Sequence, residues 1–144
     1  MNGFLLDTNV PSELTRDRAD PNVENWLEQS DDDELFLSAI SVGELFKGLT
    51  LLPKSRRRAE LERWLDSELR PWFAGRVLPV TEAIAKRWGI LIGEQQLKGS
   101  PVNGIDALIG ATAIEHDLFL VTRNVKHFTA MGIPMINPWD SGLH

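Results

Sequence analysis

Short apolar runs alternate with longer amphipathic stretches along the whole chain. Each run contains three to six residues rich in leucine, valine, isoleucine and phenylalanine, and they lie at residues 4–6, 35–40, 76–80, 118–122 and 134–136. Runs of this length are typical of strands that are buried on both faces. Because Pro79 stands near the end of the third run, that strand is expected at an edge of the sheet.

The stretches between these runs carry apolar residues at the spacing of one helix face. We expect helices over residues 23–28, 41–53, 55–71, 81–98 and 103–117. Strands that alternate with helices form βαβ units with right-handed crossovers. The pattern therefore predicts an α/β fold with a central, mainly parallel sheet of about five short strands flanked by helices.

Two of these helices carry bulky side chains with more than one interpretation. In the helix that begins at Ser55, the large apolar residues either pack in the core, form a seam between two copies or line a groove for a partner; they are Leu61, Trp64, Leu65 and Trp72. Pro71 is expected to end this helix. In the helix after Thr81 the residues expected to point inward are Ile84, Trp88, Leu91 and Ile92.

The composition limits the class of protein. A chain of 144 residues, 42% of them hydrophobic, is expected to form one domain over residues 1–144. It contains no cysteine, which excludes disulfides, zinc-thiolate sites and a thiol nucleophile. No uncharged stretch approaches the roughly 18 residues of a membrane span, and Asp7 interrupts the first apolar run. We expect a cytoplasmic protein without a membrane partner.

The net charge of −6 argues against a nucleic-acid partner, but the basic residues are unevenly placed. Lys54, Arg56, Arg57 and Arg58 follow one another in the middle of the chain. A run of this kind is either a solvated helix face or a local surface for phosphate groups. The sequence leaves both interpretations open.

Four polar positions lie where a predicted strand ends or a predicted helix begins: Asp7, Glu44, Asp106 and Asn124. In an open α/β sheet such positions converge above the carboxyl ends of the strands, where ligands bind. Gly110 and Ala113 make the helix face below Asp106 narrow, so we expect that helix to press close to the sheet and bury the carboxylate.

Each carboxylate also has a purely structural interpretation. Asp7 stands where it can cap the backbone of Asn9 or Val10. Ser41 and Glu44 have the spacing of a capping box. Asp106 occupies a first helical turn, where a carboxylate suits the helix dipole. Convergence at one sheet edge is what distinguishes a site from three ordinary helix starts.

Clustered carboxylates favour a hard divalent cation, Mg²⁺ or Mn²⁺, because they repel one another unless a cation neutralises them. Such a site supports hydrolysis of a phosphodiester by activated water. The chain has no glycine-rich phosphate loop. Its three histidines are interpreted as surface or helix-end residues rather than ligands; they are His116, His127 and His144.

The segments at residues 5–9, 41–45, 104–109 and 120–128 together resemble the PIN-domain family, most closely the VapC or FitB-like ribonuclease toxins of type II toxin–antitoxin modules. The resemblance runs the whole chain and implies a PIN-like fold and endoribonuclease activity. It implies that Asp7, Glu44 and Asp106 are the metal ligands and that Thr122 helps to hold the acidic residues. The fourth family position is often aspartate, and here it is Asn124, which makes catalysis with one metal more credible.

The resemblance also implies partners. The chain is expected to form a homodimer. The other expected partners are a VapB-like antitoxin, which covers the acidic pocket in a heterotetramer or larger assembly, and structured RNA, often transfer RNA. Thr8 and Asn9 are expected to orient Asp7, and the candidate RNA contacts are Lys54, Arg56, Arg57, Arg58 and Arg123. The alternative is a non-catalytic PIN-like protein that only binds RNA or a partner. The missing fourth carboxylate keeps that alternative open.

Overall fold

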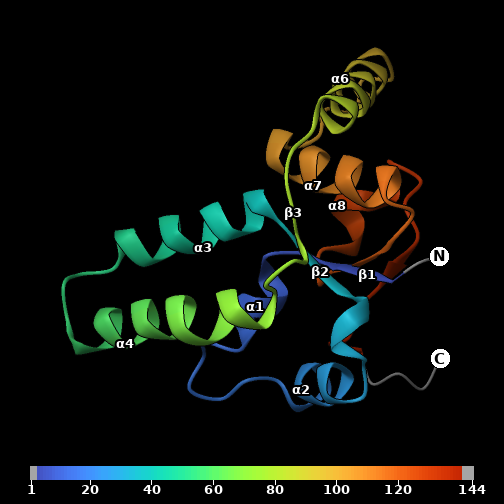
Figure 1. Cartoon of the computed structure of the whole chain (residues 1–144). Coiled ribbons are helices and arrows are strands. Elements are labelled where there is room, and N and C mark those ends of the chain that lie inside the picture. The colour runs from blue at the N-terminus through green and yellow to red at the C-terminus, as the bar shows by residue number, and fades with distance from the viewer. Residues whose placement is uncertain (1–2, 141–144) are drawn as a thin grey trace.

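The computed structural model describes residues 3–140 and contains one five-stranded sheet with the strand order β3-β2-β1-β4-β5 (Figure 1). The strands are β1 (Phe4–Leu6), β2 (Leu35–Ser38), β3 (Val77–Leu78), β4 (Phe119–Val121) and β5 (Met135–Ile136). All four pairings are parallel, which confirms the predicted fold class. β3 lies at an edge, as the proline after it predicted.

Helices connect the strands and cover the sheet. They are α1 (Asn9–Glu13), α2 (Pro21–Glu28), α3 (Ala39–Leu51), α4 (Arg56–Trp64), α5 (Arg70–Trp72), α6 (Glu82–Leu97), α7 (Gly104–Glu115) and α8 (Val125–Thr129). A 3-10 turn, η1 (Asp32–Glu34), precedes β2, and a π-helical segment, η2 (Leu65–Leu69), joins α4 to α5. No helix within residues 3–140 is long and apolar enough to cross a membrane.

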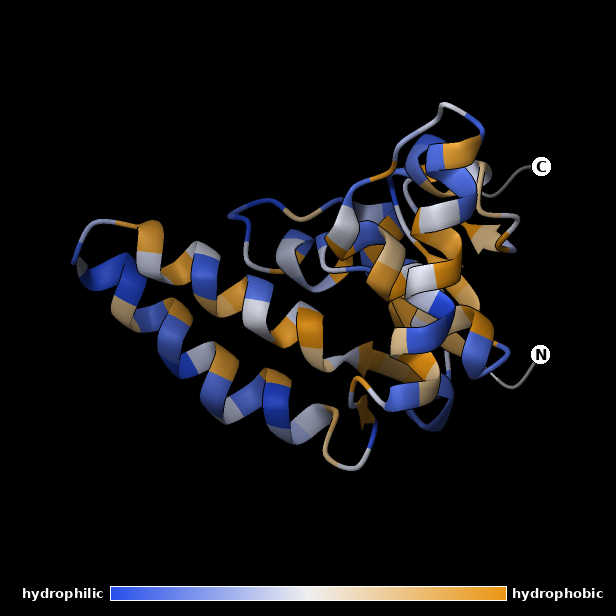
Figure 2. Ribbon diagram, turned by 90° about the horizontal axis from the view of Figure 1, so that it is seen from above, coloured by the Kyte–Doolittle hydropathy of each residue, from blue (hydrophilic) through white to orange (hydrophobic). Residues whose placement is uncertain are grey.

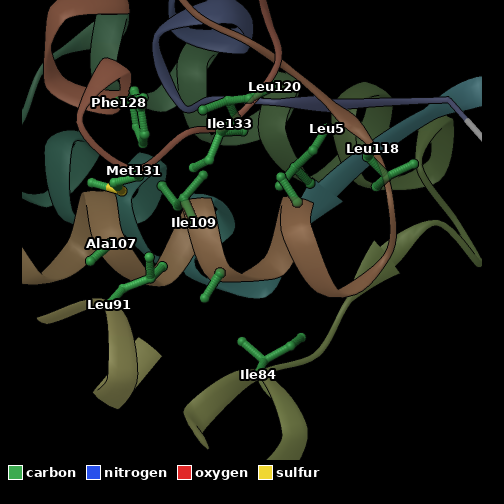
Figure 3. Packing of buried hydrophobic residues seen from close by; sticks show 12 residues of the cluster. Leu5, Ile84, Leu91, Ala107, Ile109, Leu118, Leu120, Phe128, Met131 and Ile133 are labelled. Carbon is green, nitrogen blue, oxygen red and sulfur yellow. The ribbon is translucent and has the colours of Figure 1, made fainter. Parts of the chain in front are cut away.

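Successive residues of the central strands point to opposite faces of the sheet, and each face has its own core. Leu5 and Leu120 belong to the cluster that packs against α6 and α7 (Figure 3). Leu6 and Val121 belong to the cluster beneath α3, α4 and η2. This arrangement explains why the central strands are continuously apolar rather than alternating.

The strand register aligns the residues that follow each strand. Leu6 pairs with Leu37 on one side and with Val121 on the other. The next residues along the two innermost strands are Asp7 and Thr122, which therefore meet at the carboxyl edge of the sheet. This edge is where parallel α/β sheets place their ligand sites.

Helix α3 begins at Ala39, two residues before the start that the sequence predicted. Strand β2 ends at Ser38, whose hydroxyl accepts a hydrogen bond of 3.1 Å from the amide of Ile40 and caps α3. Ser41 thus lies inside the helix rather than at its start. The capping-box interpretation of Ser41 and Glu44 is therefore wrong, and the carboxylate of Glu44 is available for another role.

α3 and α4 lie side by side as an arm that extends from the sheet (Figures 1 and 2). The helix that begins at α4 continues through η2 to Trp72, so the prediction that Pro71 ends it is wrong. Proline lacks the amide that an α-helical ladder requires. The π-helical turn before Pro71 changes the backbone hydrogen-bonding pattern there, so the helix continues beyond the proline.

The bulky residues of this arm pack mainly inward, which favours the core interpretation. Leu65 is buried, and Leu61, Trp64 and Trp72 are partly buried against the same cluster. On α6, Ile84 and Leu91 face the core as predicted. Trp88 does not, because 38% of it is exposed and its indole N–H donates to the carbonyl of Gly104 at 3.0 Å.

Helix α7 packs closely on the segment after α8. A Cβ at Gly110 would stand 2.7 Å from Cδ1 of Ile133 and 3.1 Å from Sδ of Met131. Gly110 and Ala113 are both buried, so the narrow helix face was predicted correctly. The prediction that Asp106 is buried was wrong, because 21% of its side chain is exposed. The helix approaches its neighbours one turn beyond the carboxylate.

Candidate active site

Asp7 is the buried centre of the polar cluster at the sheet edge, with only 4% of it exposed. Its Oδ1 accepts a hydrogen bond from the amide of Thr8 at 2.8 Å, and its Oδ2 accepts one from the hydroxyl of Thr122 at 2.8 Å. The side-chain amide of Asn9 donates to Oδ2 at 3.3 Å. Asp7 therefore does not cap Asn9 or Val10 through its side chain.

Thr122 connects the two central strands at their ends. It is fully buried directly after β4, where its hydroxyl donates to Asp7. The same oxygen accepts the amide of Asn124 at 2.9 Å and the side-chain amide of Asn9 at 3.4 Å. The hydroxyl has one proton and two acceptor positions, so all of its hydrogen-bonding capacity is used. The geometry agrees with the expectation that Thr122 holds the acidic residues.

Glu44 joins the cluster through a chain of hydroxyl groups. The hydroxyl of Thr8 lies 2.6 Å from Oε1 of Glu44 and 2.9 Å from Oγ of Ser41. A carboxylate accepts and does not donate. Thr8 therefore gives its single proton to Glu44, and the buried Ser41 hydroxyl can donate to Thr8. This chain links the loop after β1 to the second turn of α3.

The Asp7 carboxyl responds to its burial and to two neighbouring acids. Burial first, and then the negative charges of Asp106 and Glu44, raise the pKa of Asp7 from 3.8 to about 6, against the lowering effect of its hydrogen bonds from Thr122 and Thr8. A carboxyl buried beside two acids is costly to ionise. The sheet edge therefore carries a charge that favours either a proton or a cation.

Asp106 approaches this edge from the first turn of α7. The Asn103 side chain caps the helix by accepting the amides of Ile105 and Asp106 at 2.8 and 3.2 Å. Oδ2 of Asp106 lies 3.1 Å from Nδ1 of His127, whose side chain is 59% exposed. The sequence correctly placed His127 at the surface, but it did not predict the contact with Asp106. His116 ends α7, as expected, and His144 lies outside the described residues.

The position expected for a fourth ligand is not drawn into the cluster. Asn124 is exposed, and within residues 3–140 its side chain makes no hydrogen bond; only its backbone amide contacts Thr122. Arg123 beside it places its guanidinium 5.5 Å from the ring centre of Trp139. Both side chains are exposed.

The donor set suits a hard divalent cation, although the site is not closed around one. Asp7, Glu44 and Asp106 supply only carboxylate oxygens, which are the ligands that Mg²⁺ and Mn²⁺ prefer. Within residues 3–140, no three acidic or histidine side chains are drawn close enough to hold an ion as they are arranged. The electrostatic coupling at Asp7 is the observation that supports a cation, which would draw the three together.

Four of the five candidate RNA contacts lie on the arm, and two of these four are already engaged. Arg57 pairs with Asp17 at 3.1 Å and donates to the carbonyl of Thr15 at 2.9 Å. Arg58 donates to the carbonyl of Leu52 at 3.2 Å. Lys54 and Arg56 are exposed. The structure therefore divides the basic run into two arginines that brace the arm and two exposed cations without a hydrogen bond or ion pair from their side chains among residues 3–140.

A groove connects the basic arm to Glu44. It has a volume of about 290 Å³ and runs between α1, α3 and α4, with Thr8 and Glu44 among its lining residues and Arg57 and Leu61 farther along the arm. Its walls are largely leucine side chains. A second cavity of about 290 Å³ lies beside Asp106 and is lined by Asn103, Lys126 and His127.

Three participating side chains were not assigned to the site from the sequence. Ser41 was interpreted as a helix cap, Asn103 only as a helix start, and His127 as a surface residue. The serine and the asparagine are polar residues beside a candidate acid, which is a usable signal. The sequence offers no such signal for His127, because this residue stands 21 positions from Asp106.

Comparisons with known proteins agree with this geometry. A family model described as PIN domain matches residues 4–132. The VapC ribonuclease Y4jK of Sinorhizobium fredii is 37% identical over 95% of this chain and 98% of its own length, and the toxin FitB of Neisseria gonorrhoeae is 36% identical over 94% and 98%. A solved structure of FitAB bound to an IR36 DNA fragment has a chain with a TM-score of 0.91 at 33% identity, covering 98% of this chain and 99% of that one.

Proposed function

Because the chain belongs to the PIN domain family, we propose that it is the ribonuclease toxin of a type II toxin–antitoxin module and acts on RNA in the cytoplasm. The reaction is hydrolysis of internal phosphodiester bonds and depends on Mg²⁺ or Mn²⁺. Relatives named VapC ribonuclease and toxin FitB, each matched over nearly its whole length, support this proposal.

The observation that carries the proposal is the burial of the Asp7 carboxyl at the sheet edge, within reach of the charges of Asp106 and Glu44. The pKa of the buried Asp7 carboxyl rises to about 6 because of its burial and the nearby charges of Asp106 and Glu44. A fold that only needed helix starts at these places would gain nothing from bringing the acids together. A divalent cation removes the repulsion, so the cluster is more stable in its presence.

The residues that would hold the cation are Asp7, Glu44 and Asp106. The chemistry supplied by a bound divalent cation is polarisation of a phosphoryl oxygen and activation of a water molecule. The protein supplies orientation. Hydrogen bonds from Thr8 and Thr122 fix both oxygens of Asp7, and the Thr8 hydroxyl directs Oε1 of Glu44. Thr122 and Asn9 are positioning residues in this scheme.

RNA binding is assigned to the basic side chains that remain free. Lys54 and Arg56 are exposed at the turn between α3 and α4, and Lys126 lines the cavity beside Asp106. Phosphate contacts on both sides of the carboxylates would hold a strand across the site. Arg57 and Arg58 contribute mainly by bracing the arm, because their guanidinium groups already bind the protein.

The same groove suits the antitoxin. A VapB-like partner would place an extended or helical segment with apolar side chains along the leucines between α1, α3 and α4, which leads to Glu44. A basic side chain at the end of that segment would neutralise the carboxylates and block substrate. The FitAB complex, which contains a close structural relative, supports a toxin held in a complex.

The test is cleavage of a mixed cellular RNA pool by the full chain, purified free of its antitoxin. We expect discrete fragments with Mg²⁺ or Mn²⁺ and none with EDTA or with the Asp106→Asn variant. Asp33→Asn is the matched control, because Asp33 is exposed and precedes β2, at the opposite edge of the sheet. Fragments from wild type and Asp33→Asn alone would establish the metal-dependent nuclease.

The alternative is a non-catalytic protein that binds RNA or a partner. It predicts no cleavage by folded, antitoxin-free protein in either metal, with RNA retained in a binding assay. Lys54→Glu combined with Arg56→Glu then tests the binding surface: we expect weaker binding and a shallower dependence on salt, because two phosphate contacts are lost. Unchanged affinity and salt dependence would assign the arm to a solvated surface.

A further inference from the structure

The segment after β5 is fastened through every polar atom of Trp139. The backbone amide of this residue donates to Oδ1 of Asn137 at 2.9 Å, and its carbonyl accepts the side-chain amide of Asn22 at 3.1 Å. The indole N–H donates to Oε1 of Glu13 at 3.3 Å. The ring is partly buried against the core cluster beneath α3, α4 and η2. Both the place of this residue and the direction of its ring are therefore defined.

Glu13, which holds the indole, is a buried acid outside the candidate site. It lies at the end of α1 and is 4% exposed. It also accepts the backbone amide of Asp20 at 2.9 Å and a guanidinium N–H of Arg16 at 3.4 Å, so Trp139 supplies one of its three donors. Burying a carboxylate is costly unless its oxygens are hydrogen-bonded. Closing the core needs only an apolar side chain, whereas this buried acid also fixes the direction of the ring.

The fixed ring carries a cation on its face. Cζ of Arg123 lies 5.5 Å from the centre of the Trp139 ring, which is within the range in which an indole face attracts a guanidinium. The Arg123 side chain is exposed and forms no hydrogen bond or ion pair among residues 3–140. Its N–H donors therefore stay available for a ligand, whereas those of Arg57 and Arg58 already bind backbone carbonyls.

The backbone places Arg123 next to the carboxylates. It directly follows Thr122, whose hydroxyl donates to Oδ2 of Asp7 at 2.8 Å. The Arg123 amide donates to Oδ1 of Asn9 at 3.5 Å, and the side-chain amide of Asn9 in turn donates to Asp7 at 3.3 Å. Because β5 is parallel to β4, the segment that carries Trp139 leaves the sheet at the same carboxyl edge. Arginine and ring thus stand beside the candidate site.

From this arrangement we propose that Trp139 is a positioning residue, which holds the Arg123 guanidinium at the sheet edge to bind a phosphate group of the RNA substrate. A guanidinium binds two phosphate oxygens at once. A side chain that already rests on a ring loses less freedom when it binds, which strengthens the contact. The inference rests on the proposed function, since the phosphate belongs to the RNA. It adds a contact after β4 to those assigned to the arm and to Lys126.

Two substitutions of Trp139 in the full, antitoxin-free chain separate the ring face from its anchor. Trp139→Phe and Trp139→Leu both lose the hydrogen bond to Glu13 and both stay apolar, but only phenylalanine keeps an aromatic face. We expect Trp139→Leu to raise the apparent KM for cleavage of the RNA pool about fivefold with little change in kcat, because binding alone is weakened. Trp139→Phe should bring KM back to within about twofold of wild type. A ring that only closes the core would leave KM unchanged in both.

A double-mutant cycle shows whether the ring acts through the arginine. Arg123→Ala should raise the apparent KM about tenfold, and adding Trp139→Leu to it should have no further effect, because the ring then has no guanidinium to hold. Arg70→Ala is the matched control and should leave KM unchanged. Arg70 is an exposed arginine beside β3, at the opposite edge of the sheet.

Binding of the labelled RNA pool in EDTA measures the same contact without cleavage. We expect Arg123→Ala to weaken binding and to make its dependence on salt shallower by about one phosphate contact. If wild type cleaves no RNA but these changes in binding appear, the nuclease proposal fails and this inference stands. If Arg123→Ala leaves KM and the salt dependence of binding unchanged, or if the effects of Arg123→Ala and Trp139→Leu on KM simply multiply, the inference is overturned.

Discussion

The two sides of the candidate site hold their acids in different ways. Asp7 is 4% exposed and receives hydrogen bonds from Thr8, Asn9 and Thr122. Asp106 keeps 21% of its side chain exposed, and among residues 3–140 a single side chain, His127, is hydrogen-bonded to its carboxylate. The first acid is fixed by the fold. The second can adjust to whatever occupies the site, so substrate and cation are expected to reorder the α7 side and leave the β1 side unchanged.

The difference originates in the backbone. The β1 side is set by the pairing of Leu6 with Val121 at the centre of the sheet, which leaves no freedom for the residues that follow. The α7 side is a helix start that faces a cavity of about 290 Å³. Central strands are usually the most stable part of a domain, and exposed helix ends the least.

The largest expected effect comes from removing the buried charge. Asp7→Asn should reduce RNA cleavage by at least roughly a hundredfold, since even an outer partner of a metal ligand costs ten- to a hundredfold. Its stability without metal should be unchanged or increased, because the costly ionisation is gone. Asp106→Asn should lose activity without gaining stability. Thermal unfolding in EDTA separates the two, and an Asp7→Asn variant that is folded and fully active would disprove the metal site.

Stability without metal should depend on pH through Asp7. The pKa of its carboxyl is about 6 in the folded protein against 3.8 ordinarily, so the folded state holds the proton more tightly than the unfolded one. The stabilisation is complete below pH 3.8 and is lost as the pH rises through 6. It corresponds to about 3 kcal/mol. The measurement is the free energy of unfolding of the wild type minus that of Asp7→Asn. This difference should decrease as the pH rises from 3.8 to 6. A difference that does not change with pH would show that the pKa of Asp7 is not raised.

Loss of the Thr122 hydroxyl should have the next largest effect. Thr122→Val keeps the shape but leaves Asp7 and two amides short of a partner in a buried place, at a cost of about 1–3 kcal/mol. Thr122→Ser keeps the hydroxyl and should retain most of the activity. Denaturant unfolding and RNA cleavage of both variants make the comparison. If Thr122→Val and Thr122→Ser have equal stability and equal cleavage activity, the hydrogen bond from Thr122 to Asp7 contributes little to either.

Changes on the α7 side should affect stability least. His127 is 59% exposed, so its contact with Asp106 is worth less than about 1 kcal/mol. We expect His127→Ala to leave unfolding nearly unchanged and to lower cleavage severalfold, because the carboxylate of Asp106 loses its hydrogen bond with the His127 ring. His116→Ala is the matched control, because His116 is exposed at the other end of α7, and it should change neither stability nor cleavage. A large loss of stability in His127→Ala would show that both sides of the site are equally fixed.

Much of this fold could be predicted because its signals are local. The apolar run at residues 4–6 has the bounds of β1, and the convergence of Asp7 and Thr122 follows from parallel strands of matching length. The start of α3 was misplaced because two serines, Ser38 and Ser41, can each cap a helix. Tertiary packing selects the earlier one, which the pattern of apolar residues does not reveal.

The α7 side was predicted less well because it depends on distant contacts. The exposure of Asp106 and the orientation of Asn124 are decided by how α8 and the segment after it dock on α7. That docking involves Gly110 and Ile133, which are well separated along the chain. Side chains on loops and helix starts can point in several directions, whereas a residue at the end of a central strand has little choice.

The pairing of β1 with β4 also sets the order in which this protein becomes competent during synthesis. The hydrogen bond between Thr122 and Asp7 joins residues 115 positions apart, and such non-local contacts form late. While β4 is still inside the ribosome, β1 cannot pair with it. The nascent chain therefore lacks the site. The candidate site is assembled only when translation of the chain is almost complete, so unfinished chains lack it.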